Sequence, residues 1–333
     1  MPRFPGVERR LLVVILTLAV LLAPAAAGAQ ATGKIHRIGV LETTSSAGNA
    51  ANLAAFREGL QEAGYVVGRN VVLEYRYAEG RPERFKELAA ELVRLKVDVI
   101  LTRGTPAVLA AKGATRTIPI VMAASGDPIL SGIVPSLARP GGNVTGLSAT
   151  TVEVNGKRLE LLRALLPRLA RVAVLLNMDN PNNVLQWKEI ETVGRTLGIQ
   201  AQRLDVRKAD DIAPAFDAAI GQKAEAVVVV IEAITQANQG PIVQLAARQR
   251  LPAVYASREF VEGGGLIAYG VNYADLYRRA ARYVDKIFKG VKPADLPIEQ
   301  PTTFELLVNR KTAQALGLAI PQSLLMRADQ VIE

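Results

Sequence analysis

The sequence predicts an α/β protein built from two doubly wound, Rossmann-like lobes that a multi-strand hinge joins. From residue 35 onwards, short apolar segments alternate with amphipathic helical segments, as in parallel sheets covered by helices. The alternation starts again after Ser148. The chain has 333 residues. Without a predicted export signal at its start, about 300 remain, which is long for one core and natural for two lobes of about 150 residues each.

Residues 1–29 are predicted to be an export signal that is not part of the fold. Arg3, Arg9 and Arg10 precede an apolar run at 11–22, and Ala27-Gly28-Ala29 fits a small-x-small cleavage site. The apolar run is short for a membrane span, although an uncleaved anchor is the alternative. The chain has no cysteine, so it cannot be a lipoprotein or form a disulfide. We therefore expect a protein of the bacterial periplasm.

The first half reads as a parallel sheet with its connecting helices. Pro82 suits the first turn of a helix and Gly64 the end of another. Strands are predicted at residues 35–41, 71–77, 97–101, 118–123 and 144–148, and helices at 52–63, 82–96, 104–112 and, as a short amphipathic turn, 129–137.

The second half repeats the pattern. Strands are predicted at 171–176, 199–204, 226–231, 253–255 and 266–270, and helices at 154–166, 182–197, 210–220, 241–249 and 274–288. We expect one lobe to contain residues 32–148 with part of 266–333, and the other to contain 149–265. The strand at 266–270 is expected to cross back, and the proline-punctuated tail, 292–333, to lie on the surface or between the lobes.

Hydroxyl groups at predicted strand ends form the first part of the candidate site. Thr44 and Ser45 follow the first strand, Thr105 opens a helix, and Ser125 follows the strand at 118–123. Ligands of open α/β sheets bind at the carboxyl ends of the strands. Hydroxyl groups and free amides at a helix start suit a carboxylate, although any one of these side chains could instead cap a helix.

Charged, amide and aromatic residues complete the candidate site. Asp127 and Glu232 suit an ammonium group, and Asn177 ends a strand of the second lobe. Asp127 is expected to line the cleft, because the residues before it are too small to cover it; the alternative is an Asx turn before Pro128. Tyr255 and Tyr269 lie near strand ends or the hinge and are further candidates.

Signatures of common enzymes and cofactor sites are missing from the sequence. It has no phosphate-binding G-x-x-x-x-G-K-[ST] motif and no G-x-S-x-G elbow, and its glycine run at 263–268 leads into a strand instead of a helix. With one histidine, His36, and no cysteine, we expect no zinc or copper site and no cofactor. The net charge of +9 comes from bases interleaved with acids, so nucleic acid is not expected as a partner.

Residues 118–148, 251–270 and 277–333 resemble the substrate-binding proteins of ATP-binding-cassette (ABC) importers, and in particular the tryptophan/tyrosine-type proteins. Asp127-Pro128 matches an Asp-Pro pair of that family, and residues 263–270 match its glycine-rich crossing. The loops at 43–46 and 177–181 depart from the sequence usual in that family. Differences in such loops change which ligand is expected, but not the expected fold. The resemblance implies a type I periplasmic-binding fold with three hinge crossings and a ligand closed between the lobes.

The resemblance also implies the function. We expect a monomeric receptor that performs no chemistry. It would capture a small polar solute, an amino acid or a related compound that could be aromatic, and deliver it to an ABC permease and its ATPase. Two alternatives remain open from the sequence. One is a ligand-sensing subunit that docks on a membrane receptor, and the other is a two-lobed α/β transferase.

Overall fold

The computed structural model describes residues 34–149 and 151–333, with the side chains of 151–153 left aside. The predicted export signal, residues 1–29, lies outside the described residues. Every helix and strand below belongs to one compact unit, His36–Glu333.

The first sheet has five parallel strands in the order β2-β1-β3-β4-β5. They are β1 (His36–Glu42), β2 (Val71–Tyr77), β3 (Val99–Arg103), β4 (Ile120–Ser125) and β5 (Val144–Ser148). The connecting helices are α2 (Ala50–Glu62), α3 (Phe85–Arg94) and α4 (Thr105–Ala114), with 3₁₀ turns at Ala47–Asn49 and Pro82–Arg84. Every residue of β3, β4 and β5 is buried, as expected for strands of a parallel sheet that helices cover on both faces.

The second sheet has seven strands in the order β12-β11-β10-β9-β8-β6-β7, and the β10–β11 pair is antiparallel. The strands are β6 (Arg171–Leu176), β7 (Gln200–Asp205), β8 (Ala226–Val229), β9 (Ala253–Tyr255), β10 (Ile267–Gly270), β11 (Glu305–Asn309) and β12 (Gln330–Ile332). Its helices are α5 (Thr151–Leu165), α6 (Pro181–Leu197), α7 (Ile212–Gly221), α8 (Ala233–Ala237), α9 (Gln239–Arg248), α10 (Arg258–Glu262), α12 (Arg310–Leu316) and α13 (Gln322–Leu325), with a 3₁₀ turn at Ala209–Asp211.

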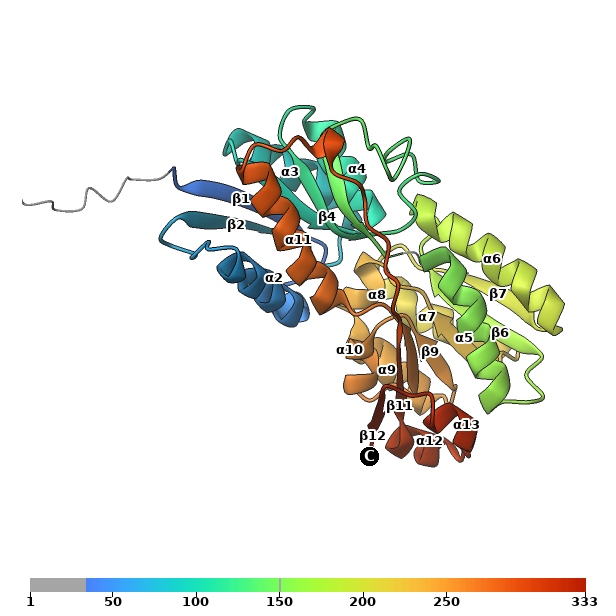
Figure 1. The fold of residues 1–333 in the computed structure, drawn as a ribbon. Coiled ribbons are helices and arrows are strands. Elements are labelled where there is room, and N and C mark those ends of the chain that lie inside the picture. The colour runs from blue at the N-terminus through green and yellow to red at the C-terminus, as the bar shows by residue number, and fades with distance from the viewer. Residues whose placement is uncertain (1–33, 150) are drawn as a thin grey trace, which may run out of the picture. The chain divides into compact units, whose positions relative to one another are not determined.

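The remaining long helix, α11 (Tyr273–Phe288), returns to the first sheet, where it packs against α2 and β4 (Figure 1). A last 3₁₀ turn, Pro293–Asp295, lies near β5. We call the five-stranded sheet with α2–α4 and α11 the first lobe, and the seven-stranded sheet with its helices the second lobe. The chain passes between the lobes after β5, after β10 and before β11. The third segment runs beside the first, because Ser148 N donates to Glu299 O at 2.8 Å.

Strand pairing corrects the predicted boundary at residue 265. β10 is hydrogen-bonded to β9 and to β11, so it belongs to the second lobe and the chain crosses back after Gly270. The predicted strands at 71–77, 144–148, 171–176 and 253–255 are confirmed with the same bounds. No helix forms at 129–137. Gly132 adopts a left-handed φ of 72° there, and Pro135 has no amide proton to donate.

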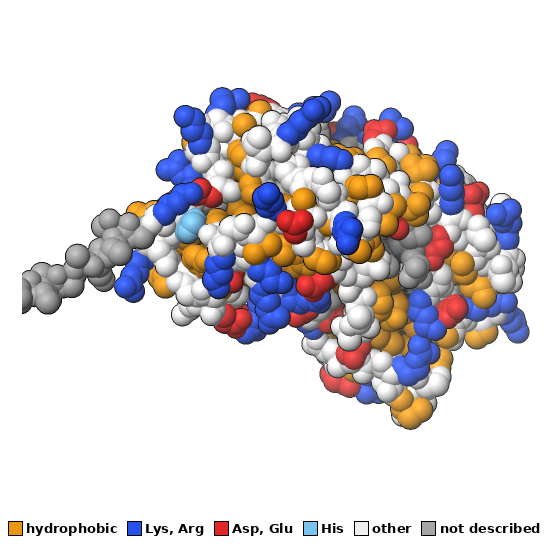
Figure 2. Space-filling model, turned by 45° about the horizontal axis from the view of Figure 1, so that its top comes forward, with side chains coloured by type: hydrophobic (Ala, Val, Ile, Leu, Met, Phe, Trp, Pro, Cys, Tyr) orange, Lys and Arg blue, Asp and Glu red, His pale blue; other side chains and the backbone are white. Residues whose placement is uncertain are grey.

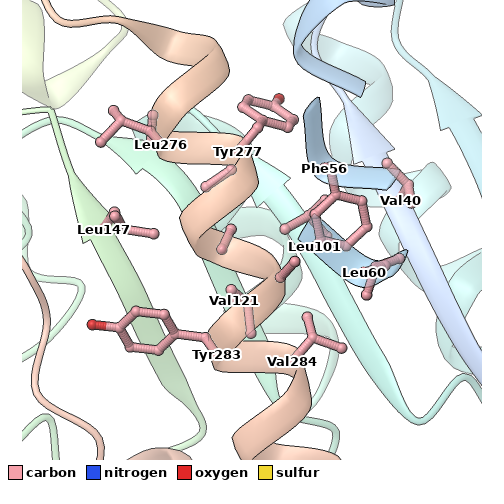
Figure 3. Packing of buried hydrophobic residues seen from close by; sticks show 14 of the residues in the cluster. Val40, Phe56, Leu60, Leu101, Val121, Leu147, Leu276, Tyr277, Tyr283 and Val284 are labelled. Atoms are coloured by element: carbon pink, nitrogen blue, oxygen red, sulfur yellow. The ribbon is translucent and has the colours of Figure 1, made fainter. Parts of the chain in front are cut away.

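The first lobe has a core on each face of its sheet, one beneath α3 and α4 and the other beneath α2 and α11. Figure 3 shows Phe56 and Leu60 of α2 beside Tyr277 and Val284 of α11, over strand residues that include Val121. The two helices come close at Gly59, where an added Cβ would lie 2.9 Å from Ala281 Cβ and would overlap with the carbonyl oxygen of Arg278.

Gly59→Ala is expected to destabilise the protein by about 1–3 kcal/mol, because the new methyl group meets backbone that cannot move without separating the helices. This cost exceeds the gain of about 1 kcal/mol in helix propensity. Gly113→Ala is the matched control, since Gly113 also lies in a helix and an added Cβ would meet nothing within 4 Å. It should stabilise by about 0.5–1 kcal/mol. Urea unfolding of both variants measures the difference, and equal effects would contradict this reading of Gly59.

Candidate functional site

A cavity of about 100 Å³ is lined by residues of both lobes. Four of the predicted site residues line it: Thr105 and Ser125 of the first lobe, and Asn177 and Glu232 of the second. Its other polar lining residues are Thr43, Arg103, Asp179, Asn180, Asn182 and Gln236. Its apolar lining residues are Pro82, Phe85, Pro106, Ala124, Ala149, Ile231, Ala233 and Tyr273. Strand ends supply most of the polar groups, as the rule for open α/β sheets requires.

The first-lobe side of the cavity contains the start of α4. Gly104 occupies the N-cap position with φ 76°, and no side chain caps the first turn. Thr105 follows it, and Thr43, directly after β1, lies on the same lining. The two threonines are 2% and 4% exposed. Among the described residues, neither hydroxyl has a hydrogen-bond partner.

Arg103 ends β3 and lines the cavity with a side chain that is 4% exposed. Its Nη1 donates to Asn49 Oδ1 at 3.0 Å, and its guanidinium lies 5.2 Å from the centre of the Tyr273 ring. Asn49 in turn donates to Glu42 Oε2 at 2.7 Å, and the Tyr277 hydroxyl donates to Glu42 Oε1 at 2.9 Å. Burial raises the pKa of Glu42 to about 7. This network holds the guanidinium at the cavity wall.

Glu232 is the buried carboxylate of the second-lobe wall, at 7% exposed. Its Oε1 accepts from the amide of Ile234 at 2.6 Å, so it also caps α8. Burial raises the pKa of Glu232 to about 7, against the lowering effect of hydrogen bonds from the Ile234 and Thr235 amides and from Asn177. The site therefore contains a carboxyl group that changes its charge near neutral pH.

The structure does not bring Asp127 into the cavity lining. Its Oδ1 accepts from the amides of Ile129 and Leu130, at 2.9 Å each, which closes an Asx turn. The backbone amide of Asp127 donates across the lobes to Asn182 Oδ1 at 3.1 Å. The turn, which was the alternative interpretation of Asp127, is thus what the structure contains.

Four other candidates also lie away from the cavity. Thr44 is buried with its hydroxyl 3.5 Å from Ser45 O, and Ser45 Oγ accepts from the amide of Gly48. Tyr255 is buried in the second-lobe core and stacks on Phe260, with ring centres 4.7 Å apart. Tyr269 packs in the core around β10, 5.9 Å from the Phe304 ring. Tyr255 is thus a core residue, and the half-buried Tyr269 packs against the edge of a core.

Neither a membrane-spanning helix nor a metal cluster occurs in the described part of the chain. None of its helices combines the length and apolar character needed to cross a membrane. No group of three or more His, Cys, Asp or Glu side chains is placed there to hold a metal ion. Figure 2 shows Lys and Arg side chains scattered among acidic and neutral ones over the face in view.

Comparisons with known proteins give a consistent family. A family model described as ABC transporter substrate binding protein matches residues 37–332. The tyrosine-binding protein of Clostridioides difficile is 26% identical over 263 residues, which are 79% of this chain and 75% of that protein.

Solved structures agree in fold over nearly the whole chain. An ABC domain from Streptococcus pneumoniae in complex with L-tryptophan is 29% identical, with a TM-score of 0.82 and coverage of 89% of this chain and 99% of that one. A conserved domain protein of Vibrio cholerae is 27% identical, with a TM-score of 0.84 and coverage of 90% and 100%. The predicted fold class, two α/β lobes of the type I periplasmic-binding kind, is confirmed.

Proposed function

The chain belongs to the ABC transporter substrate-binding protein family, and from this premise we propose that it is a periplasmic receptor that captures a small polar solute and delivers it to a membrane permease with its ATPase. The observation that carries the proposal is the cavity at the strand ends, with polar side chains from both lobes. A ligand that contacts both lobes favours the closed arrangement by its differential affinity for that state.

Aromatic amino acids are the first ligands to test. The C. difficile relative is a tyrosine-binding protein, and the S. pneumoniae structure contains L-tryptophan. The chemical character of the lining suits such a compound, because polar groups stand beside apolar residues such as Phe85 and Ile231. Glu232 is the group we assign to a ligand ammonium, with Asn177 beside it.

The predicted signal supports export, and the missing cysteine supports release into the periplasm, because a lipid anchor would need one. We propose that the protein is a monomer. Enzymatic activity is not part of the proposal, since the family comprises binding proteins.

A ligand screen tests the proposal. We expect L-tryptophan, L-tyrosine or L-phenylalanine to raise the melting temperature, because a ligand that binds only the folded state stabilises it by about 2.7 kcal/mol at roughly a hundred times its Kd. Small-angle scattering should then show a smaller radius of gyration with ligand. Leucine, myo-inositol and 5-methylthioribose are added to the screen to represent an aliphatic amino acid, a polyol and a sugar. If no compound of any class raised the melting temperature, the receptor function would be contradicted.

A further inference from the structure

We propose that a network of buried polar side chains between α5 and α6 links the hinge to the cavity and positions the cavity residue Asn177. Its four members, which we call the α5–α6 network, are Arg158 and Asn155 of α5 and Gln186 and Asn183 of α6. The two helices pack side by side in the second lobe (Figure 1). This inference rests on the proposed function, which assigns the cavity to a ligand, and it adds positioning residues that lie outside the cavity lining.

Arg158 lies at the hinge end of the α5–α6 network. Its Nε donates to Tyr269 O at 2.9 Å, near the end of β10. An added Cβ at Gly270 would lie 3.5 Å from Arg158 Nη2, so the guanidinium lies against the residue after which the polypeptide crosses to the first lobe. Helix α5, which carries Arg158, is itself the first element after the crossing that follows β5. Arg158 therefore joins two of the three crossing segments on the second-lobe side.

Hydrogen bonds lead from Arg158 to the cavity without interruption. Arg158 Nη1 donates to Asn155 Oδ1 at 2.6 Å, and Asn155 Nδ2 donates to Gln186 Oε1 at 3.0 Å. Gln186 Nε2 donates to Asn183 Oδ1 at 3.0 Å, and Asn183 Nδ2 donates to the carbonyl oxygen of Asn177 at 3.0 Å. Each of the four side chains is at most 1% exposed, so solvent does not replace these bonds.

The two ends of the α5–α6 network fix the direction of every bond in it. A guanidinium can only donate and a carbonyl oxygen can only accept. Each amide between them must therefore accept on its hinge side and donate on its cavity side. Turning one amide over would place two donors or two acceptors against each other, and bonds aligned in one direction strengthen one another. A change at one member therefore disturbs the members beyond it.

The cavity end of the α5–α6 network reaches both the ligand wall and the contact between the lobes. Asn177 lines the cavity, and its side chain is hydrogen-bonded to Glu232 on the same wall. Asn183 lies in the first turn of α6 beside Asn182, whose Oδ1 accepts from the first-lobe amide of Asp127 at 3.1 Å. The network thus connects the hinge with the two places where the second lobe meets a ligand or the first lobe.

Packing alone does not explain a buried guanidinium at this place. Burial lowers the pKa of Arg158 to about 10, and the acceptors of its Nε and Nη1 are neutral oxygens. An apolar side chain would fill the space between α5 and β10 without the cost of burying a charge. A donor-only group at the hinge, however, is what orients the three amides.

Hydrogen exchange of the ligand-free protein tests the inference without any ligand. Asn155→Leu keeps the approximate shape of the side chain and removes both its acceptor and its donor. We expect the amides of residues 178–183 to exchange about tenfold faster in this variant, because Asn177 and the first turn of α6 are no longer held from the hinge. These amides lie on a different segment from Asn155, so a purely local role of Asn155 would leave their exchange unchanged.

Asn143→Leu is the matched control. Asn143 Nδ2 donates to the carbonyl oxygens of Thr115 and Ile118, at 3.0 and 2.9 Å, within the first lobe. We expect Asn143→Leu to lower the melting temperature and to leave the exchange of residues 178–183 unchanged.

A double-mutant cycle with Gln186→Met tests the network as a unit. Methionine keeps the length of the side chain and interrupts the network at its next member. Asn155→Leu should therefore change the exchange of residues 178–183 far less in the Gln186→Met background than in the wild type. Gln186→Met also tests the inference alone if Asn155→Leu does not fold.

Titration of L-tryptophan or L-tyrosine provides the binding measurement. We expect Asn155→Leu and Gln186→Met to bind about tenfold more weakly than the wild type, and Asn143→Leu to bind equally well. The inference would be overturned by unchanged exchange at 178–183 in both network variants, by additive effects in the cycle, or by unchanged affinity. If no compound of the screen bound the wild type, the receptor function would be contradicted, whereas the exchange experiment would still decide whether the α5–α6 network positions Asn177.

Discussion

Gly126→Ala is expected to weaken ligand binding by about ten- to a hundredfold and to leave the melting temperature of the ligand-free protein nearly unchanged. Gly126 directly follows β4 and lines the cavity. Asn182, at the start of α6, faces it from the second lobe. A Cβ at position 126 would overlap with Oδ1 and Cγ of Asn182 and would lie 2.6 Å from its Nδ2.

The overlap acts on lobe closure and not on the fold of either lobe. Gly126 does not have a positive φ, so alanine can adopt its backbone conformation. Asn182 is 5% exposed, which leaves its amide little room to turn away. Its Oδ1 also accepts from the amide of Asp127 at 3.1 Å, and that bond between the lobes would be lost. Gly126→Ala therefore raises the free energy of the closed arrangement, in which the two lobes meet, and leaves the stability of each lobe nearly unchanged.

A double-mutant cycle separates the steric effect from a general one. Asn182→Ala removes the group that the new methyl meets, so Gly126→Ala should cost less affinity in that background than in the wild type. Gly142→Ala is the neutral control, because an added Cβ there would meet nothing within 4 Å. Titration of L-tryptophan or L-tyrosine into the four proteins of the cycle gives the coupling. Additive effects would contradict a clash between Gly126 and Asn182.

Local patterns predicted most of the fold. The strands at 144–148 and 171–176 were predicted with the bounds that the structure gives, because short segments rich in Val and Leu indicate strands even where Thr145, Ser148 or Arg171 interrupts the apolar pattern. The missing helix at 129–137 depends on Asp127, whose carboxylate binds two backbone amides and closes a turn in its place. The sheet assignment of β10 depends on pairing with β9 and β11, and β11 lies more than thirty residues further along the chain.

The sequence analysis predicted those cavity-lining residues that lie at strand ends or helix starts. Thr105, Ser125, Asn177 and Glu232 follow strands or open helices, and they meet at the cavity. Arg103 was missed, although a charged residue that ends an otherwise apolar strand before a glycine is a detectable signal. Tyr273 was missed because the chain reaches the cavity there by a crossing from the other lobe, which no local pattern shows.

The free energy of unfolding is expected to fall as the pH rises from 4.5 to about 7, by about 3 kcal/mol for each of Glu42 and Glu232. Burial raises both pKa values from 4.5 to about 7 in the folded protein. Between these values the folded state binds more protons than the unfolded state. The stabilisation is therefore complete below pH 4.5 and is lost as the pH passes through the folded pKa.

Differences between variants isolate each group from the other titrating residues. Glu232→Gln keeps an oxygen that can accept from the Ile234 amide, and Glu42→Gln keeps the size of the side chain within its network. Each variant should lose about 3 kcal/mol of the pH dependence seen in the wild type between pH 4.5 and 7. Urea unfolding at a series of pH values measures this. The assignment would be refuted if Glu232→Gln showed the same dependence of the unfolding free energy on pH as the wild type. It would also be refuted if the wild type became more stable as the pH rose from 4.5 to 7.

Ligand binding should couple to the same titration. At pH 6 the Glu232 carboxyl group is mostly protonated, since its pKa is about 7. An ammonium group placed beside it favours the ionised form, so binding should lower its pKa and release a proton. Titration of L-tryptophan or L-tyrosine at pH 6, in buffers with different ionisation enthalpies, would reveal that proton as a buffer-dependent heat. Glu232→Gln should abolish the dependence on buffer, whereas Glu42→Gln should keep it, because Glu42 lies behind Arg103 and outside the cavity lining.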